Sequence, residues 1–356
     1  MRPCDDALMQ SNEKPDGVIY AFETRPETGE TMQIAPGLFW LRMHLPFSLA
    51  HINLWLVDEG ESWSVIDTGV AVDECKAIWE QTFAGTMQGR PISRVIATHL
   101  HPDHIGCAGW LTDQFDAPLY MSRDEYLLAR ILVADTGRAT PEEGDRFYTA
   151  AGFEPDQLEH YHRMFGMFGK FVAPLPESFH RLSDGQSLNI GAYEWQVIIG
   201  KGHSPEHVCL YCESINTLIS GDQLLPTISS NVSVFPTEPE ADPLADWMDS
   251  LRMLKTRIPA DALVLPAHGK PFRGAHFRLD ELILEHETSL ETLEAFCTKP
   301  QRAVDAFPAL FKSKINNNNL IMAAGESIAH LNYLQNTGRM TVARDEQGVD
   351  WYSTMA

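Results

Sequence analysis

The sequence predicts a layered α/β fold that is followed by a small second domain. Apolar, strand-like runs alternate with segments of helical periodicity, a pattern typical of layered α/β architectures. Histidine and aspartate residues directly follow several of the apolar runs, and α/β proteins place their sites at such strand ends. Hydrophobic residues make up 44% of the 356 positions, which is enough for a large core.

The chain opens with residues 1–33, which are polar and predict an N-terminal arm. Three strands with intervening turns are then expected, over "GLFWLRMH", "INLWLVDEG" and "SWSVIDTG". The spacing of "VDECKAIWEQTF" predicts a helix, and the apolar run "ISRVIATH" predicts a buried strand. A further helix and strand follow, so the alternation continues to about residue 123.

Residues 124–175 differ because helical patterning dominates them, and they predict a helical insertion between strands. Flexible methionines and aromatic residues near its end can line an apolar pocket. They can equally pack the insertion onto the strands, and both interpretations stay open. These residues are Met164, Phe165, Met167, Phe168 and Phe171.

Residues 276–356 predict a linker helix and a winged-helix domain, in the order helix, helix, helix and hairpin, the hairpin turning at "DEQG". Winged helices often bind nucleic acid. However, residues 298–356 contain six basic and five acidic residues, a weak charge for a phosphate-binding surface. We therefore expect this tail to pack against the main domain or against a second subunit of a homodimer.

The net charge of −22 disfavours nucleic acid and anionic membranes as partners, since both require a basic surface. No apolar run approaches the roughly 20 residues needed to span a bilayer. The N-terminus has no apolar segment of a signal peptide, and the six cysteines are scattered. Cys209 and Cys212 have C-x-x-C spacing, but a strand there would point them to opposite sides, as ordinary buried thiols. Together these features predict a cytoplasmic protein.

The stretch "ATHLHPDHIGCAGW" places His99, His101, Asp103 and His104 within six positions, at the point where a buried strand turns into a helix. Such a turn can direct all four side chains into one cleft. Imidazole nitrogens and carboxylate oxygens suit zinc and other divalent first-row metals. A polar, solvated turn is the alternative, and four such residues together argue against it.

Other strand ends carry the same residue types. His203 lies in "GKGHSPEH", Asp222 in "LISGDQLL" and His268 in "LVLPAHGKP", each after an apolar run. Asp67 ends another strand in "VIDTG". His207 follows His203 by four positions and is either a pocket residue or a structural one. Together these signals favour a metal site over isolated polar turns.

In this order, the motifs "DTG", "HLHPDH", "GHS", "SGD" and "HG" resemble the metallo-β-lactamase superfamily. The resemblance covers about residues 34–275 and implies a catalytic domain with the αββα sandwich fold of that family. It also implies two metal ions, with Zn²⁺ as the default and iron or manganese as alternatives. The first ion would be held by His99, His101 and His203, the second by Asp103, His104 and His268, and Asp222 would bridge them.

An aspartate rather than a cysteine at position 222 points to the glyoxalase II, lactonase and ribonuclease side of the superfamily. Asp67 has no open ligand position, so we expect it to orient the ligands. We assign catalysis to Asp103, as a ligand that also helps to move a proton, and to Asp67. Lys201, Lys270 and Arg273 flank the motifs, where they either bind an anionic substrate or form a solvated rim.

These inferences predict a metal-dependent hydrolase in which a hydroxide held by two metal ions attacks a small-molecule thioester or ester. Acyl-coenzyme A and acyl-glutathione conjugates are the expected substrates. A lactonase and a metal-dependent endoribonuclease are the alternatives, and a non-catalytic metal-binding protein is a third possibility. The negative net charge of the chain argues against the endoribonuclease.

Overall fold

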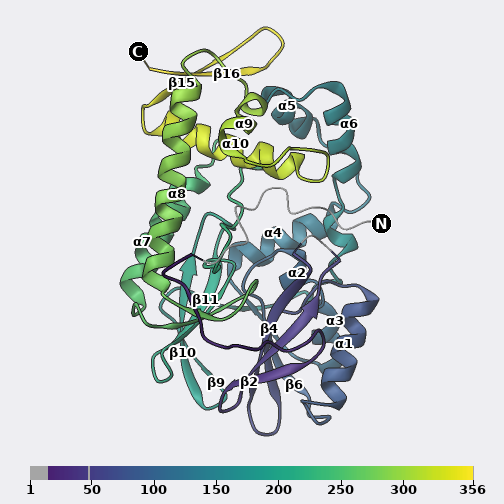
Figure 1. Cartoon of the computed structure of the whole chain (residues 1–356). Coiled ribbons are helices and arrows are strands. Elements are labelled where there is room, and N and C mark those ends of the chain that lie inside the picture. The colour runs from purple at the N-terminus through teal and green to yellow at the C-terminus, as the bar shows by residue number, and fades with distance from the viewer. Residues whose placement is uncertain (1–14, 47–48, 356) are drawn as a thin grey trace.

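The structure, a computed structural model, describes residues 15–46 and 49–355. Two seven-stranded sheets pack face to face, and helices cover their outer faces (Figure 1). This is the αββα sandwich that the sequence predicts. A smaller helical region with a two-stranded hairpin lies at one end of the sandwich.

The first sheet has the strand order β2-β3-β4-β5-β6-β7-β8. Its first four strands form an antiparallel meander, and β5 to β8 pair in parallel. The parallel pairs require crossover connections, which the helices between the strands supply. The strands are β2 (Thr31–Ala35), β3 (Leu38–His44), β4 (His51–Asp58), β5 (Trp63–Ile66), β6 (Ile92–Ile96), β7 (Leu119–Met121) and β8 (His180–Arg181).

The second sheet has the order β1-β14-β13-β12-β11-β10-β9 and is antiparallel except for the pair β12–β13. Cys209 and Cys212 lie on β11 and enter different apolar clusters, as predicted for two faces of one strand. The strands are β1 (Ile19–Tyr20), β9 (Ser187–Ile190), β10 (Tyr193–Gly200), β11 (His207–Cys212), β12 (Thr217–Gly221), β13 (Leu263–Pro266) and β14 (Phe272–Arg273).

The expected arm over residues 1–33 needs a correction. Residues 1–14 lie outside the described residues, but β1 pairs with β14 and β2 begins at Thr31. The partner of β1 comes more than 200 residues later in the chain, so no local pattern marks this two-residue strand. The segment before residue 34 therefore contributes an edge strand to each sheet.

Three apolar clusters hold these layers together. One lies between the sheets and includes Trp40, Trp55, Trp195 and Ile219, all buried. Burying one large aliphatic or aromatic side chain contributes about 1.5–3 kcal/mol. The second cluster joins the first sheet to α1 (Asp73–Ala84), α3 (Ala108–Phe115) and α4 (Arg123–Ala134), and the third joins the second sheet to α7 (Pro243–Arg257) and α8 (Ala275–Phe296).

The helical insertion consists of α4, α5 (Glu142–Ala150), α6 (Pro155–Met164) and the 3₁₀ turn η1 (Phe168–Lys170). Tyr148 and Tyr161 of α5 and α6 share an apolar cluster with the C-terminal residues Ala303 and Tyr352. Figure 1 shows α5 and α6 at the same end of the molecule as α9 and α10. Helices α5 and α6 therefore pack on the C-terminal region.

The apolar residues at the end of the insertion serve mainly in packing. Phe165 packs against the cluster of the second sheet, while Phe168 and Phe171 pack against that of the first sheet. Met164 is largely exposed. These contacts favour packing over a pocket lining for the three phenylalanines.

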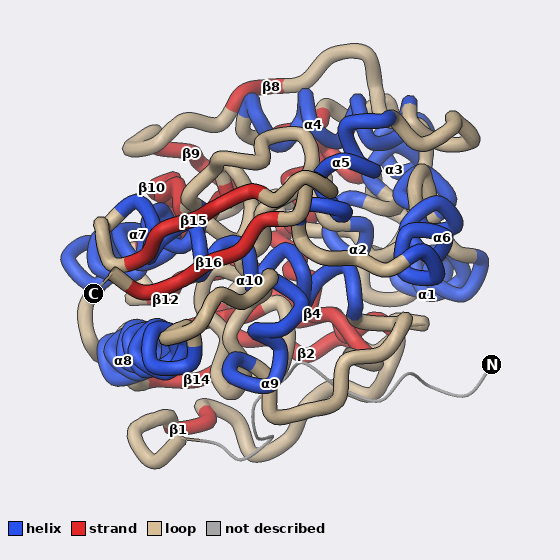
Figure 2. Tube along the Cα trace, turned by 90° about the horizontal axis from the view of Figure 1, so that it is seen from above, coloured by secondary structure: helices blue, strands red, loops and turns tan. Residues whose placement is uncertain are grey.

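The C-terminal region contains η2 (Ala303–Ala306), α9 (Phe307–Leu310), α10 (Leu320–Asn336) and a hairpin of β15 (Met340–Arg344) and β16 (Asp350–Thr354). Viewed from above, the hairpin lies over this end of the molecule (Figure 2). The predicted helix after residue 300 is a 3₁₀ turn followed by one short α-helical turn. The helix over α10 and the hairpin form as predicted, and the winged-helix assignment stays a prediction.

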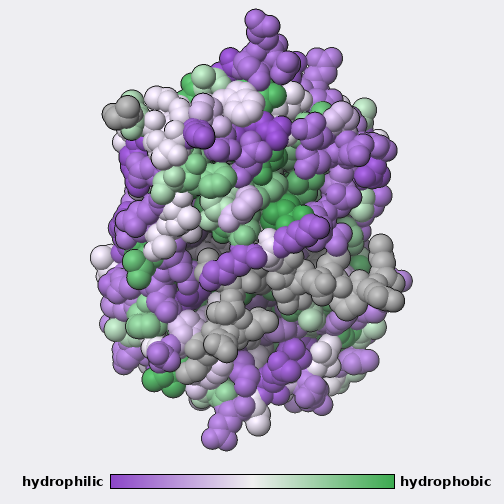
Figure 3. Space-filling model, turned by 45° about the horizontal axis from the view of Figure 1, so that its top comes forward, coloured by the Kyte–Doolittle hydropathy of each residue, from purple (hydrophilic) through white to green (hydrophobic). Residues whose placement is uncertain are grey.

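Within residues 15–46 and 49–355, no helix combines the length and the apolar character needed to cross a bilayer. Figure 3 shows one face of the molecule, most of which is hydrophilic. Apolar side chains gather near the middle of this face, between polar rims.

Candidate metal centre

The residues predicted at strand ends do lie there, and they converge. Asp67 follows β5, and His99 and His101 follow β6. The next two candidates, Asp103 and His104, belong to the short helix α2 (Pro102–Ile105). The second sheet supplies the remaining three, since β10, β12 and β13 are followed by His203, Asp222 and His268.

Two groups of possible ligand atoms result. His99, His101, His203 and Asp222 each offer one atom, and these atoms all lie within 4.8 Å of one another. Asp103, His104 and His268 form a second group that meets the same limit. Both groups combine imidazole nitrogens with a carboxylate, a donor set that suits first-row divalent cations.

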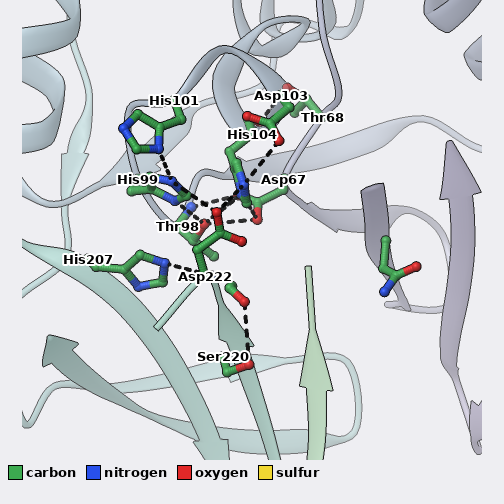
Figure 4. A network of polar contacts seen from close by, with 12 residues as sticks. Asp67, Thr68, Thr98, His99, His101, Asp103, His104, His207, Ser220 and Asp222 are labelled. Atoms are coloured by element: carbon green, nitrogen blue, oxygen red, sulfur yellow. Dashed lines mark hydrogen bonds and ion pairs between the residues drawn. The ribbon is translucent and has the colours of Figure 1, made fainter. Parts of the chain in front are cut away.

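Asp222 lies between the two groups. Its Oδ2 atom is 3.4 Å from Nε2 of His203, and its Oδ1 atom is 3.4 Å from Nε2 of His268. Figure 4 shows the Asp222 carboxylate facing the loop that carries His99 and His104. The Oδ2 atom is also 3.5 Å from Nε2 of His104, so the carboxylate as a whole lies close to histidines of both groups.

The buried polar atoms of this cluster test whether cations fit. Four of them have no hydrogen-bond partner among the described residues: Nε2 of His104, His203 and His268, and Oδ1 of Asp222. A buried polar group without a partner costs about 1–3 kcal/mol. Because these atoms all belong to the two groups, metal ions bound there would satisfy them, and the donor set fits.

The electrostatics of the two groups differ. Burial lowers the pKa of His101 to about 3, with help from His203, and lowers the pKa of His99 far below its ordinary value. His99 and His101 therefore present neutral imidazoles, the form that binds metals. In the second group, burial alone would raise the pKa of Asp103, but the nearby His104 and His268 outweigh it and lower the pKa to about 2.

Burial alone would lower the pKa values of the two histidines of the second group, but the nearby carboxylates raise these pKa values by more. Asp67, Asp222 and Asp103 raise the pKa of His104 well above its ordinary value, and the latter two also raise the pKa of His268. A cation bound to these imidazoles would therefore displace protons.

Asp67 acts on His104, as expected for a residue that orients ligands. Its Oδ2 atom is 2.8 Å from Nδ1 of His104, which directs Nε2 toward the second group. Its Oδ1 atom accepts a hydrogen bond of 2.7 Å from the backbone N–H of Thr98. The backbone of Asp67 is left-handed, with φ of 59°. Aspartate and asparagine tolerate this conformation better than most residues.

Thr98 was not predicted from the sequence. Its hydroxyl oxygen is 2.9 Å from Oδ2 of Asp67 and 3.1 Å from Nδ1 of His99. One threonine therefore connects Asp67 to a histidine of each group, because it also lies 3.2 Å from Nδ1 of His104. Its position directly before His99, at the end of a buried strand, is the signal that could have identified it.

His207 is structural. It is fully buried at the start of β11, and its Nε2 atom accepts a hydrogen bond of 3.0 Å from the backbone N–H of Asp222. Gly221 permits this contact because a Cβ atom there would lie only 2.5 Å from the imidazole. His207 therefore fixes the backbone at Asp222.

His268 depends on a long-range anchor. Its Nδ1 atom lies 3.0 Å from the backbone oxygen of His51. The buried Asn53 of β4 donates hydrogen bonds to the backbone oxygens of Pro266 and Gly269, on either side of His268. The first sheet thus holds a loop of the second.

A second buried carboxylate joins loops of the two sheets. Glu125 of α4 is fully buried, and its two oxygens accept hydrogen bonds of 2.9 Å from the backbone N–H groups of Leu100 and Glu206. Burial raises its pKa to about 7. Sequence reasoning missed Glu125, because a lone glutamate in a helix gives no signal for such a role.

The three cations near the motifs are not gathered at the ligands. Lys201 is exposed, Lys270 donates to the backbone oxygen of Glu23, and Arg273 donates to the backbone oxygen of Asp261. Binding of an anionic substrate by these residues stays a prediction.

Comparisons with known proteins agree with this arrangement. The family model described as "Metallo-beta-lactamase superfamily" matches residues 49–269, more than half of the chain. The chain therefore belongs to this superfamily and is one of its metal-binding hydrolases. A second family, described as "Metallo-beta-lactamase-like, C-terminal domain", matches residues 290–355.

One solved structure, of a beta-lactamase domain protein from Burkholderia ambifaria, is 38% identical. The match covers 95% of this chain and 98% of that one, with a TM-score of 0.87. Among curated proteins, "Probable metallo-hydrolase YqjP" of Bacillus subtilis is 24% identical over 83% of this chain and 91% of its own length.

Two curated relatives are named as thioesterases. The chain is 26% identical to "Atrochrysone carboxyl ACP thioesterase" of Aspergillus fumigatus, over 72% of this chain and 47% of that enzyme. It is also 26% identical to the human "Acyl-coenzyme A thioesterase MBLAC2", over 53% of this chain and 64% of the relative. The chain thus spans about half of the fungal enzyme and less than two thirds of the human one.

Proposed function

We propose that this protein hydrolyses small-molecule thioesters with the help of two divalent metal ions, with zinc as the default. The observation that carries the proposal is the position of Asp222 between two groups of ligand atoms. His99, His101 and His203 would hold the first ion, and Asp103, His104 and His268 the second. Asp222 would serve both.

Ions at such a site supply two kinds of chemistry, because they lower the pKa of water and polarise a carbonyl oxygen. The protein supplies orientation. Asp67 and Thr98 fix the ring of His104, and His207 fixes the backbone of Asp222. The site therefore needs no serine or cysteine nucleophile.

Asp103 is the residue that we assign to proton movement. Its pKa of about 2 keeps the carboxylate ionised at neutral pH. In the proposed reaction, water adds to the thioester carbonyl carbon, Asp103 accepts the proton, and the C–S bond breaks. The proton then leaves with the thiol, so a carboxylic acid and a free thiol are the products.

The thioester as substrate class is supported by the names of the two thioesterase relatives, one acting on acyl-coenzyme A and one on an acyl carrier protein. The net charge of −22 opposes RNA, the substrate of the alternative nuclease. A glutathione thioester is chemically similar and belongs in the same test.

The experiment measures thiol release by the zinc-loaded full chain from a panel of acyl-coenzyme A and acyl-glutathione thioesters. Asp103→Ala removes the proton acceptor. Asp113→Ala removes an exposed carboxylate from the nearby helix α3 and serves as the matched control. We expect release by the wild type and by Asp113→Ala, and loss of release in Asp103→Ala.

Equal release by wild type and Asp103→Ala would contradict the role of Asp103. Absence of release from every thioester, in a protein that binds its metal ions, would overturn the thioester proposal. Lactones and single-stranded RNA would then be the substrates to test, since they represent the lactonase and the endoribonuclease.

A further inference from the structure

A loop of the catalytic domain separates the first ligand group from the C-terminal helix α10. The loop follows Asp222 along the chain, and Asn231 lies in its middle. The backbone oxygen of Asn231 is 2.7 Å from Nδ1 of His203. A protonated Nδ1 donates this hydrogen bond, which leaves Nε2 free and directs it toward Asp222.

Helix α10 holds this loop through several hydrogen bonds. The side-chain amide of Asn231 donates to Oε2 of Glu326, at 2.7 Å. The backbone N–H of Val234 donates to the oxygen of Gly325, at 3.1 Å. Ser233 donates to Oδ1 of Asn231 at 2.6 Å and lies 3.3 Å from the oxygen of Met322. Both ends of the Asn231 amide are therefore occupied.

The packing between loop and helix is as close as the backbone allows. A Cβ atom at Gly325 would lie 2.7 Å from Cβ of Ser233 and 2.9 Å from the oxygen of Val234. Glycine therefore lets α10 approach the loop at the residue next to Glu326. In Figure 1, α10 lies across the top of the sandwich, where the strand ends carry the site.

Glu326 is held there without a cation. Among the described residues, no lysine or arginine forms an ion pair with it, although Lys312 lines the same cavity. Glu326 lines this small cavity of about 100 Å³ together with His286 and His330, whose buried imidazoles are neutral at pH 7 because burial lowers their pKa values to about 3 and about 4. Its polar contact is directed to the loop that touches His203.

We propose that Glu326 is a positioning residue for the metal centre, acting through Asn231 on His203. The proposal rests on the proposed function, because it takes His203 as a metal ligand. Glu326 fixes the Asn231 amide, the Asn231 carbonyl fixes the imidazole of His203, and the first ion is bound by an imidazole that is oriented in advance. The C-terminal domain thereby supports a site to which it contributes no ligand.

The test measures metal binding by the full-length chain. The metal-free wild type and variants are titrated with Co²⁺ and Zn²⁺, and the visible spectrum of bound Co²⁺ reports the geometry of the ligands. Outer residues that orient ligands typically change metal affinity by about 10–100-fold. We expect Glu326→Ala to lower the affinity for one of the two bound ions by that factor. The spectrum of Co²⁺ bound at that site should change as well.

Two further variants separate positioning from general stability. Glu326→Gln keeps an oxygen that accepts from Asn231, so it should restore the affinity. Asn332→Ala is the matched control, because Asn332 also lies on α10 and donates to the catalytic domain, at the backbone oxygen of Ala241, 2.9 Å away. Its acceptors Pro239 and Ala241 lie near the end of that loop, eight and ten positions after Asn231, so Asn332→Ala leaves the bonds of Asn231 intact and should bind both ions as the wild type does.

Asn231→Ala provides an independent approach should Glu326→Ala not fold. It should lower the affinity for the same ion. The double variant should bind this ion no less tightly than either single variant, since both changes break the same connection. Equal affinities in Glu326→Ala, Asn231→Ala and Asn332→Ala would overturn the proposal.

His203→Ala, titrated in parallel, distinguishes this inference from the proposed function. If His203→Ala still binds two ions with wild-type affinity, the proposed ligand set fails. If it loses an ion while Glu326→Ala and Asn231→Ala bind normally, only the positioning role of Glu326 fails.

Discussion

The two ligand groups are supported from different parts of the molecule. His104 is held by Asp67 and Thr98, which follow strands β5 and β6 of the first sheet, 37 and 6 positions before it in the chain. His203 is held by Asn231, on a loop bonded to helix α10 of the C-terminal region. The second group is thus supported from within the sandwich, and the first depends on the appended domain.

This difference shows that the ligands and their supports obey different constraints. The ligands must come from strand ends, because these ends converge at one edge of the sandwich. A supporting residue needs only to reach the unused nitrogen of an imidazole or the backbone beside it. It can therefore come from any element that packs there, including one that follows much later in the chain.

The largest effect is expected from removing the carboxylate of Asp222, which the two groups share. Asp222→Ala should lose both metal ions together with activity, because this carboxylate lies close to histidines of both groups. The loss should exceed the about 10–100-fold typical of residues that only orient ligands. Elemental analysis and the thiol-release rate measure it, with the exposed Asp156→Ala on α6 as control. An unchanged metal content in Asp222→Ala would rule out the bridging role.

Asp67→Asn should affect the second group most, because Asp67 contacts His104 directly and reaches His99 only through Thr98, with about 10–100-fold lower metal affinity or activity. Asparagine tolerates the left-handed backbone at this position, so stability should change less than function. The measurements are metal titration and thermal unfolding. Asp116→Asn is the control, because it makes the same change in an exposed residue that is also left-handed. An unaltered rate in Asp67→Asn would argue against its orienting role.

Asn53→Leu should act on stability first. It leaves the indole N–H of Trp40 and the oxygens of Pro266 and Gly269 buried without their partner. Each such group costs about 1–3 kcal/mol, so the free energy of unfolding should fall by a few kcal/mol. Urea unfolding measures this loss. A metal titration of the folded variant should show a lower affinity for the second ion. Normal metal affinity would mean that the loop of His268 keeps its position without Asn53.

The last expected effect is a pH dependence of stability at the interface with α10. Burial raises the pKa of Glu326 to about 7, so the folded protein holds a proton that the unfolded chain releases near its ordinary pKa. The stability contributed by this proton is complete below the unfolded pKa and is lost as the pH rises through about 7. The magnitude is up to about 1.4 kcal/mol for each unit between the two pKa values.

Glu326→Gln removes this titration. Urea unfolding at pH 5 and pH 8 should show a smaller decrease in stability for Glu326→Gln than for the wild type. Parallel decreases in both proteins would show that other groups carry the pH dependence.

The layered α/β class and the seven candidate ligands follow from local sequence, whereas the αββα sandwich and the division of the ligands between two ions follow from the resemblance to the metallo-β-lactamase superfamily. Apolar runs predict the strands, and each predicted ligand directly follows such a run or starts the next helix, so one short window is sufficient to find it. The same reasoning found α1 and the helix and hairpin of the C-terminal region. It did not find β1, whose partner β14 is distant in the chain.

The supporting residues could not be predicted in this way. Asn53 and its acceptor Pro266 are separated by 213 positions, and Asn231 and Glu326 by 95. Glu125 connects to Glu206 across 81 positions. A polar side chain in an otherwise ordinary strand or helix gives no indication of such a partner. Asp67 is the exception, because the resemblance already marked it as a residue that orients ligands. Thr98 could have been found, since it directly precedes a predicted ligand.

The contact between the insertion and the C-terminal region has a consequence for biosynthesis. The backbone N–H of Val304 donates to the oxygen of Ala151, and Arg302 pairs with Glu154, 148 positions earlier. A ribosome adds about 5–20 residues per second. Helices α5 and α6 are therefore synthesised well before the surface that covers Tyr148 and Tyr161 exists. During that interval their apolar face lacks this cover, so the insertion completes its packing only after residues 302–304 have been synthesised.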